Sequence, residues 1–102
     1  MKVPTVVSLN IANAVVPAAQ RLIRVTQGDQ LSLRITSDAP GQLHVHAYRI
    51  EAQVVPGQTA QVLIPAFATG RFRVEWHPAA GRVAAAGTQH APALAMLEVH
   101  PR

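Results

Sequence analysis

Two of the five histidines stand one residue apart, in the segment His44-Val45-His46. Residues at positions i and i+2 of a β-strand point to the same face, so both imidazoles could bind one metal ion. Neutral imidazole is a good ligand for Cu(II), Zn(II) and Ni(II). A site needs a third ligand, and His90 and His77 are the candidates. The alternative is that these are ordinary strand histidines held by hydrogen bonds.

The chain contains no cysteine. Disulfide bonds, thiolate zinc sites and cysteine nucleophiles are therefore excluded. A blue-copper centre is also excluded, because its trigonal site requires a thiolate. Apart from Met96, no soft ligand remains to favour Cu(I). We therefore expect copper as Cu(II) in a type 2-like site, or zinc, or no metal at all.

Length and composition indicate a globular protein. The chain has 102 residues, of which 49% are hydrophobic and 14% are charged, and this is not the composition of a disordered chain. We expect a single domain over residues 1–102. No apolar run approaches the length of a transmembrane helix, so no membrane span is expected, and we expect a monomer.

The formal net charge is +4, and arginine supplies nearly all of the positive charge. The arginines are scattered and no aromatic-basic motif accompanies them, so a nucleic-acid partner is not expected. Arg71 and Arg73 form an exposed pair that could contact an acidic protein partner. The plainer interpretation of this pair is a solvated surface.

Catalysis is not expected. The chain has no nucleophile motif, no phosphate-binding glycine loop and no paired carboxylates. Glu75 and His77 are near each other in sequence, but we do not expect them to act together as an acid–base pair. With five acidic residues in all, we predict that the protein is not an enzyme.

The dominant hydrophobic period is two, which predicts β-strands. Residues 21–26 and 31–36 alternate on either side of a turn at Gly28-Asp29 and are predicted to be antiparallel strands. Residues 78–91 have little pattern and are predicted to be a long loop. The further strands are expected at 5–12, 42–50, 59–66, 70–77 and 93–100. Seven or eight short strands with regular turn signals predict an all-β sandwich.

Alternation also predicts which side chains face inward. Over 42–50 it places His44, His46, Tyr48 and Ile50 on one face, and Tyr48 and Ile50 suggest that this face turns inward, with Arg49 outside.

Over 70–77, alternation places Trp76 in the core with its apolar neighbours. His77 then lies on the outer face, unless the chain bends at Pro78. His90 lies in the predicted loop, which could fold over the same end of the sandwich. A set of His44 and His46 with either of these two remains open.

In their order along the chain, these features resemble a cupredoxin-like domain. The features are the Gly28-Asp29 turn, the "HVHAY" strand, the "VPGQ" turn and the "GRFRVEWH" strand, and they cover about residues 20–100. The resemblance implies a Greek-key β-sandwich. Members of this family are typically exported proteins that transfer electrons or handle copper.

The copper-ligand pattern of the family is only partly present. His46 matches the first copper ligand best, with His44 as the alternative. The position of the family's cysteine is occupied by Trp76, and the loop histidine corresponds to His90. The axial methionine position falls near residue 93, not at Met96. The resemblance therefore implies the scaffold without a type 1 copper site.

A bacterial cupredoxin-like subgroup that lacks cysteine is more similar still. Its pattern matches "QLHVHAY" at 42–48, with Ala47 in place of a glycine, and "GRFRVEWH" at 70–77. The similarity implies an exported, periplasmic setting. The first residues do not resemble a signal peptide, so an exported form would be the mature chain with a starting Met.

These observations lead to two functional hypotheses. The first is an exported binding module that holds Cu(II) or another divalent metal through His44, His46 and a loop histidine. The second is a metal-free structural or protein-partner-binding domain that keeps only the scaffold.

Overall fold

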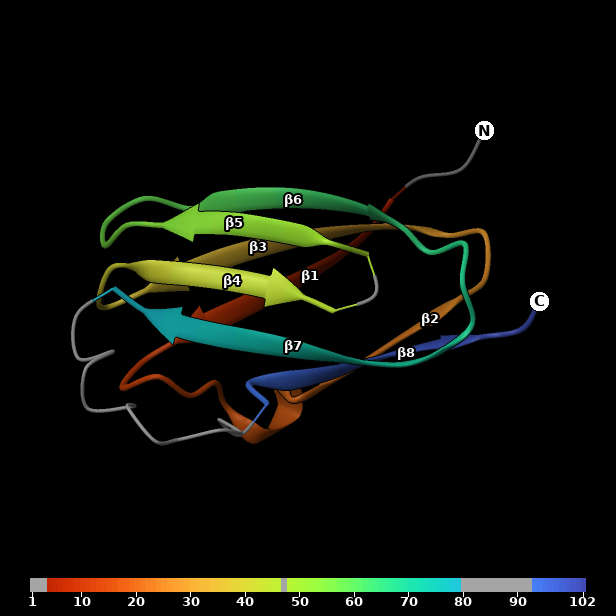
Figure 1. Cartoon of the computed structure of the whole chain (residues 1–102), viewed down its shortest axis with the longest axis horizontal. Coiled ribbons are helices and arrows are strands. Elements are labelled where there is room, and N and C mark those ends of the chain that lie inside the picture. The colour runs from red at the N-terminus through yellow and green to blue at the C-terminus, as the bar shows by residue number, and fades with distance from the viewer. Residues whose placement is uncertain (1–3, 47, 80–92) are drawn as a thin grey trace.

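The computed structural model describes residues 4–46, 48–79 and 93–102, and almost all of the regular structure in these ranges is β-strand (Figure 1). A 3-10 helix, η1 (Ala18–Gln20), precedes β2. Within the described ranges, no helix is long and apolar enough to cross a membrane. The strands are β1 (Thr5–Ile11), β2 (Leu22–Thr26), β3 (Gln30–Ser37), β4 (Gly41–Val45), β5 (Ile50–Val54), β6 (Ala60–Pro65), β7 (Gly70–Pro78) and β8 (Ala95–His100).

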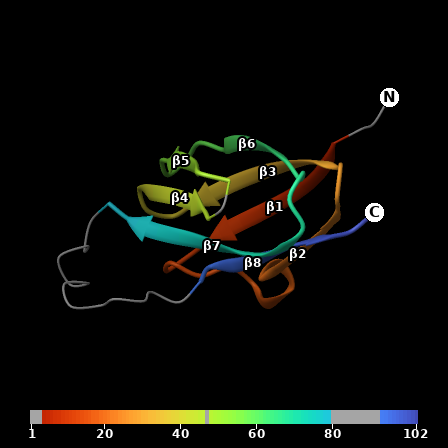
Figure 2. The same ribbon diagram turned by 45° about the vertical axis from the view of Figure 1, so that its right-hand side comes forward.

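The strands form two sheets, which confirms the predicted all-β sandwich. One sheet has three strands in the order β1-β3-β6, and the other has five in the order β2-β8-β7-β4-β5. The β1–β3 and β2–β8 pairs are parallel, and the other pairs are antiparallel. Figure 2 shows the two sheets from a second side, with β5 next to β6 where their edges approach. The Greek-key connectivity stays a prediction.

The predicted pairing of the strands around Gly28-Asp29 is wrong. β2 pairs with β8 in the five-stranded sheet, while β3 pairs with β1 and β6 in the three-stranded sheet. The turn therefore carries the chain from one sheet to the other (Figure 1). Alternation gives each strand one inward face, but it does not say which strand lies beside it.

The hydrophobic core lies between the sheets and follows the alternation of each strand. Leu31, Leu33 and Ile35 of β3 are fully buried, and Leu97 of β8 packs in the same core from the other sheet. A fully buried side chain of this size contributes roughly 1.5–3 kcal/mol through the hydrophobic effect. Trp76 is buried as expected. The two sheets are therefore held together by the inner half of each alternating pattern.

The prediction of one strand over 42–50 is wrong in two ways. The segment forms two strands, β4 and β5, joined by a turn in which Arg49 has a positive φ of 55°. Within β4, Leu43 and Val45 are buried, so His44 lies on the outer face of the sheet. The inward face was assigned from Tyr48 and Ile50, but the alternation of β4 does not continue through the turn to those residues. The exposure of Arg49 is confirmed.

Candidate metal centre

The pairing of β4 with β7 determines which side chains meet on the outer face. His44 lies directly opposite Glu75 in this antiparallel register. The backbone N–H of His46, just beyond the end of β4, donates to the carbonyl oxygen of Arg73 at 3.0 Å. This bond keeps His46 beside β7 after the strand has ended. The two histidines and the carboxylate are therefore brought together by strand pairing.

His44, His46 and Glu75 form a compact group of possible metal ligands. One ligand atom from each lies within 4.8 Å of the others. The imidazole rings have centroids 4.7 Å apart, and His46 Nε2 lies 3.1 Å from Glu75 Oε1. Ligands about 2.0–2.1 Å from a tetrahedral ion are about 3.3 Å from one another. The 3.1 Å between His46 Nε2 and Glu75 Oε1 already meets this value. A distance between ligand atoms as long as 4.8 Å would have to shorten when the ion binds.

His77 lies at the margin of the same group. Its Nε2 is 3.3 Å from Glu75 Oε1, and its ring centroid is 6.3 Å from that of His44. Glu75 and His77 lie on one face and are in contact, because residues two apart on a strand share a face. The expectation that they do not act as an acid–base pair stays a prediction. The predicted outer position of His77 is confirmed, and the outward His44 of β4 lies next to it.

Glu75 lies beside three basic side chains. Its Oε1 faces His46 and His77, and its Oε2 accepts a bond from Arg73 Nε at 3.2 Å. Partial burial alone would raise the pKa of Glu75, but the hydrogen bonds and positive charges of His46 and Arg73 outweigh it and lower that pKa. Glu75 is therefore held as a carboxylate, the form that can bind a metal ion.

The other two histidines are placed differently. His90 lies outside the residues that the structure describes, so its role as a loop ligand stays a prediction. His100 ends β8, where its Nε2 lies 3.2 Å from Glu98 Oε1. Among the residues that the structure describes, His100 does not belong to the three-ligand group. Glu75 was missed as a ligand, although the period of two over 70–77 already places it on the face of His77.

Tyr48 anchors the turn that follows His46. Its hydroxyl donates to the carbonyl oxygen of Ala68 at 2.9 Å. Its ring packs edge-to-face against Phe67 and Phe72, with centroids 5.2 and 5.3 Å away. Aromatic pairs of this geometry add about 0.5–1.5 kcal/mol each beyond the area that they bury. The turn is therefore tied to the chain around the start of β7.

The chain's single tyrosine gives a direct pH test of this anchor. Burial raises the pKa of Tyr48 above 10.0, more than the hydrogen bond to Ala68 lowers it. Because the folded-state pKa lies above the unfolded one, Tyr48 stabilises the fold fully below about pH 10, and this contribution is lost as the pH rises through the folded-state pKa. Ultraviolet titration of the phenolate should show a midpoint above 10.0, and Tyr48→Phe is the blank. A midpoint at or below 10.0 in the folded protein would contradict the partial burial of the Tyr48 hydroxyl.

Comparison with known proteins supports the fold. No protein-family profile and no curated protein sequence matches this chain. Among solved structures, a Cu-containing nitrite reductase from Thermus scotoductus matches with a TM-score of 0.69 and 17% identity over 98% of this chain and 28% of its own. A copper binding protein in the apo form matches with a TM-score of 0.64 and 10% identity over 98% of this chain and 93% of its own. A heme-copper terminal oxidase matches with a TM-score of 0.65 and 13% identity over 96% of this chain and 65% of its own.

The chain therefore has a cupredoxin-like fold, and at these identities the similarity shows the fold alone. The chain spans less than two thirds of the nitrite reductase and of the terminal oxidase. It lacks the cysteine of a type 1 site. His44 points away from the core, whereas Trp76 points into it. A type 1 copper ion does not fit this set of residues, while a Cu(II) or Zn(II) ion fits two imidazoles and a carboxylate.

Proposed function

We propose that this chain is a divalent-metal-binding module that holds Cu(II) through His44, His46 and Glu75. The observation that carries the proposal is the convergence of one ligand atom from each of these side chains within 4.8 Å, where β4 and the turn after it lie beside β7. Copper is the preferred ion because Cu(II) forms the strongest complexes of the divalent first-row metals with such ligands. The likeness to copper proteins supports the same choice.

The site is proposed to bind a metal ion without catalysing a reaction. The side chain of His46 is 48% exposed, while that of Glu75 is 17% exposed. An ion held here would lie on the outer face of the five-stranded sheet, open to water, and not between the sheets. Such a position suits binding and release of the ion more than a reaction that needs a water-excluded pocket. We further propose an exported, periplasmic setting, as the family resemblance implies.

Titration of the purified, tag-free protein with Cu(II) and Zn(II) tests the proposal. We expect one ion per chain, with micromolar or tighter affinity for Cu(II). Electron paramagnetic resonance should show a type 2 signal without an intense blue band, because no thiolate is present. Binding should weaken on acidification, since protons compete for the imidazole nitrogens. Weak binding that does not saturate at one ion per chain would favour the metal-free scaffold instead.

A further inference from the structure

A second charged group lies on the same outer face, in a row across β2, β8 and β7. Arg24 and Arg71 both lie opposite Glu98, one on each side of it. Neighbouring strands are about 4.8 Å apart, so the two arginine Cα atoms are separated by about 10 Å. The row therefore places a guanidinium group on each side of one carboxylate.

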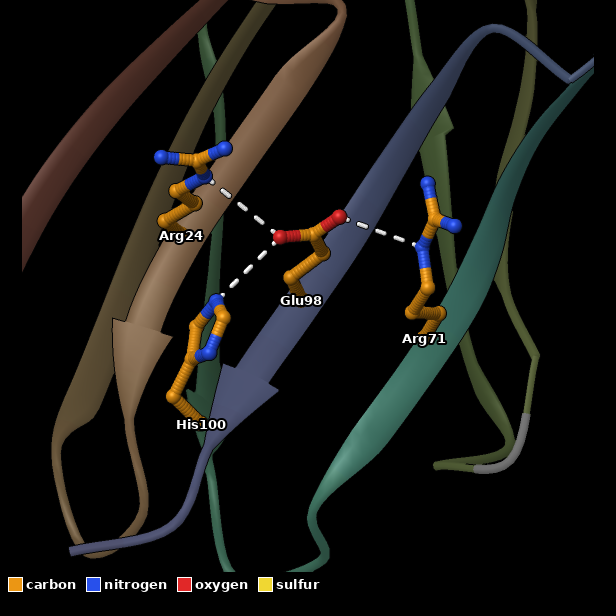
Figure 3. Close-up of polar contacts among 4 residues, drawn as sticks. All are labelled: Arg24, Arg71, Glu98 and His100. Carbon is orange, nitrogen blue, oxygen red and sulfur yellow. Dashed lines mark hydrogen bonds and ion pairs between the residues drawn. The ribbon is translucent and has the colours of Figure 1, made fainter.

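Glu98 contacts the Nε atom of each arginine side chain. Its Oε1 lies 3.4 Å from Arg24 Nε and its Oε2 lies 3.1 Å from Arg71 Nε, while Oε1 also contacts His100 (Figure 3). The Glu98 side chain is 14% exposed, against 68% for Arg24 and 67% for Arg71. The carboxylate is thus the recessed part of the row. Figure 3 shows the terminal nitrogens of both guanidinium groups on the side away from Glu98.

The row has an excess of positive charge and of hydrogen-bond donors. One carboxylate balances only one of the two guanidinium charges, and the whole chain carries +4. Each guanidinium has five N–H donors in a planar fork, and only the Nε donor is directed at Glu98. The terminal donors remain in the geometry that binds carboxylates in a bidentate manner.

The surroundings of the row suit a protein partner. In the next row of the same face, Leu22 lies opposite Met96, and Leu22 is 41% exposed. On the other side, a hollow of about 340 Å³ is lined by residues 69–71 and 98–101. Exposed apolar side chains beside arginine and methionine are typical of protein–protein interfaces.

A nucleic-acid strand fits this surface less well. Glu98 lies between the two arginines and would repel a continuous phosphate backbone. Binding of single strands also relies on aromatic side chains that stack on bases. All four aromatic residues are described by the structure, and none lies in this row: Tyr48 packs against Phe67 and Phe72, and Trp76 is buried.

We propose that the Arg24–Glu98–Arg71 row is the docking site for an extended acidic segment of a partner protein. Acidic residues two apart on an extended chain are about 7 Å apart. Two such carboxylates can each pair with one guanidinium and pass over the recessed Glu98. Apolar residues of the segment would then contact Leu22 and Met96. The interaction needs no metal ion.

The test uses a fluorescent seven-residue peptide of alternating Glu and Ser, with a Gln and Ser peptide as the control. Anisotropy is measured at low and physiological salt with a chelator present. We expect Arg24→Gln/Arg71→Gln to bind the acidic peptide at least about tenfold more weakly than the wild type, because two charge-assisted bonds are lost. Arg34→Gln is the matched control, since Arg34 is exposed on β3 of the other sheet, and it should bind like the wild type.

Three outcomes would overturn the proposal. The first is an equal affinity of the double variant and the wild type. The second is tighter binding of an oligothymidine than of the acidic peptide, which would make the partner a nucleic acid. The third comes from nuclear magnetic resonance of the wild type, which does not depend on how a variant folds. Peptide-induced amide shifts should lie on β2, β7 and β8, and shifts confined to the three-stranded sheet would contradict the docking site.

Discussion

Replacing His44 and His46 together by alanine is expected to weaken Cu(II) binding at least about 100-fold. Loss of even an outer partner of a metal ligand costs 10–100-fold in affinity, and this variant removes two direct ligands. Both side chains point to the outer face, so the core is not affected and the unfolding transition should change little. Competition against a chelator of known affinity measures the effect, and thermal unfolding checks the fold.

His100→Ala is the matched control for the double variant. Like His46, His100 places its Nε2 beside a glutamate oxygen, but it does not belong to the three-ligand group among the described residues. Its removal should leave the Cu(II) affinity unchanged. If this single variant loses as much affinity as the double variant, copper binds to histidines non-specifically and the proposed centre is wrong.

A second pair of variants distinguishes the loss of a carboxylate ligand from the loss of a negative charge elsewhere on the same face. Glu75→Gln removes one ligand charge and should weaken Cu(II) binding, whereas Glu98→Gln removes the same charge beside arginines and a histidine without affecting binding. Both glutamates are mostly buried and pair with exposed cations. Exposed ion pairs contribute roughly 0–1 kcal/mol, so both variants should fold. Equal affinities of the two variants would exclude Glu75 as a ligand.

Gly41→Ala is expected to lower the free energy of unfolding by about 3 kcal/mol, since overpacking a tight site typically costs 1–3 kcal/mol and occasionally more. A Cβ atom at this position would overlap the indole ring of Trp76, with Cη2 at 2.6 Å, and would lie 2.9 Å from the carbonyl oxygen of His77. Neither group can move freely, because Trp76 is buried and the carbonyl belongs to β7. The chain would have to separate β4 from β7. Urea unfolding measures the loss.

Gly57→Ala provides the contrast to this prediction. Gly57 has φ of 84°, and an added Cβ would meet nothing within 4 Å. Its cost is therefore only that of a left-handed backbone for alanine, about 1–2 kcal/mol. We also expect Gly41→Ala, but not Gly57→Ala, to weaken Cu(II) binding, because β4–β7 pairing places His44 opposite Glu75. An equal effect of both substitutions on stability would mean that the Trp76 contact is not the cause.

The sheet content could be predicted from local pattern, but the partners of each strand could not. Leu31, Leu33 and Ile35 alternate with polar residues, and all three are buried in β3. The same alternation was equally compatible with a hairpin between β2 and β3. The assignment of β2 and β3 to different sheets depends on the pairing of β2 with β8 and of β3 with β1 and β6, and these partners are distant in sequence.

The candidate site was predicted in part. His44 and His46 were recognised from their spacing, and the absence of cysteine excluded blue copper. The direction of the histidines was predicted wrongly, because Tyr48 was treated as a continuation of the same strand. Arg49 has no glycine or proline beside it, yet it takes a positive φ in a turn, and no short-range signal marks that turn.

Composition and the period of two determined that this chain forms β-strands around an aliphatic core, and the lack of cysteine determined what kind of copper site it cannot have. These properties depend on residue types and on neighbours along the chain. Only the tertiary structure decided that His44 and His46 face outward and that Glu75 completes their group. The reason is that strand register is a relation between distant segments: the burial of Leu43 and Val45 selects the face of β4, and pairing with β7 selects the residue opposite His44.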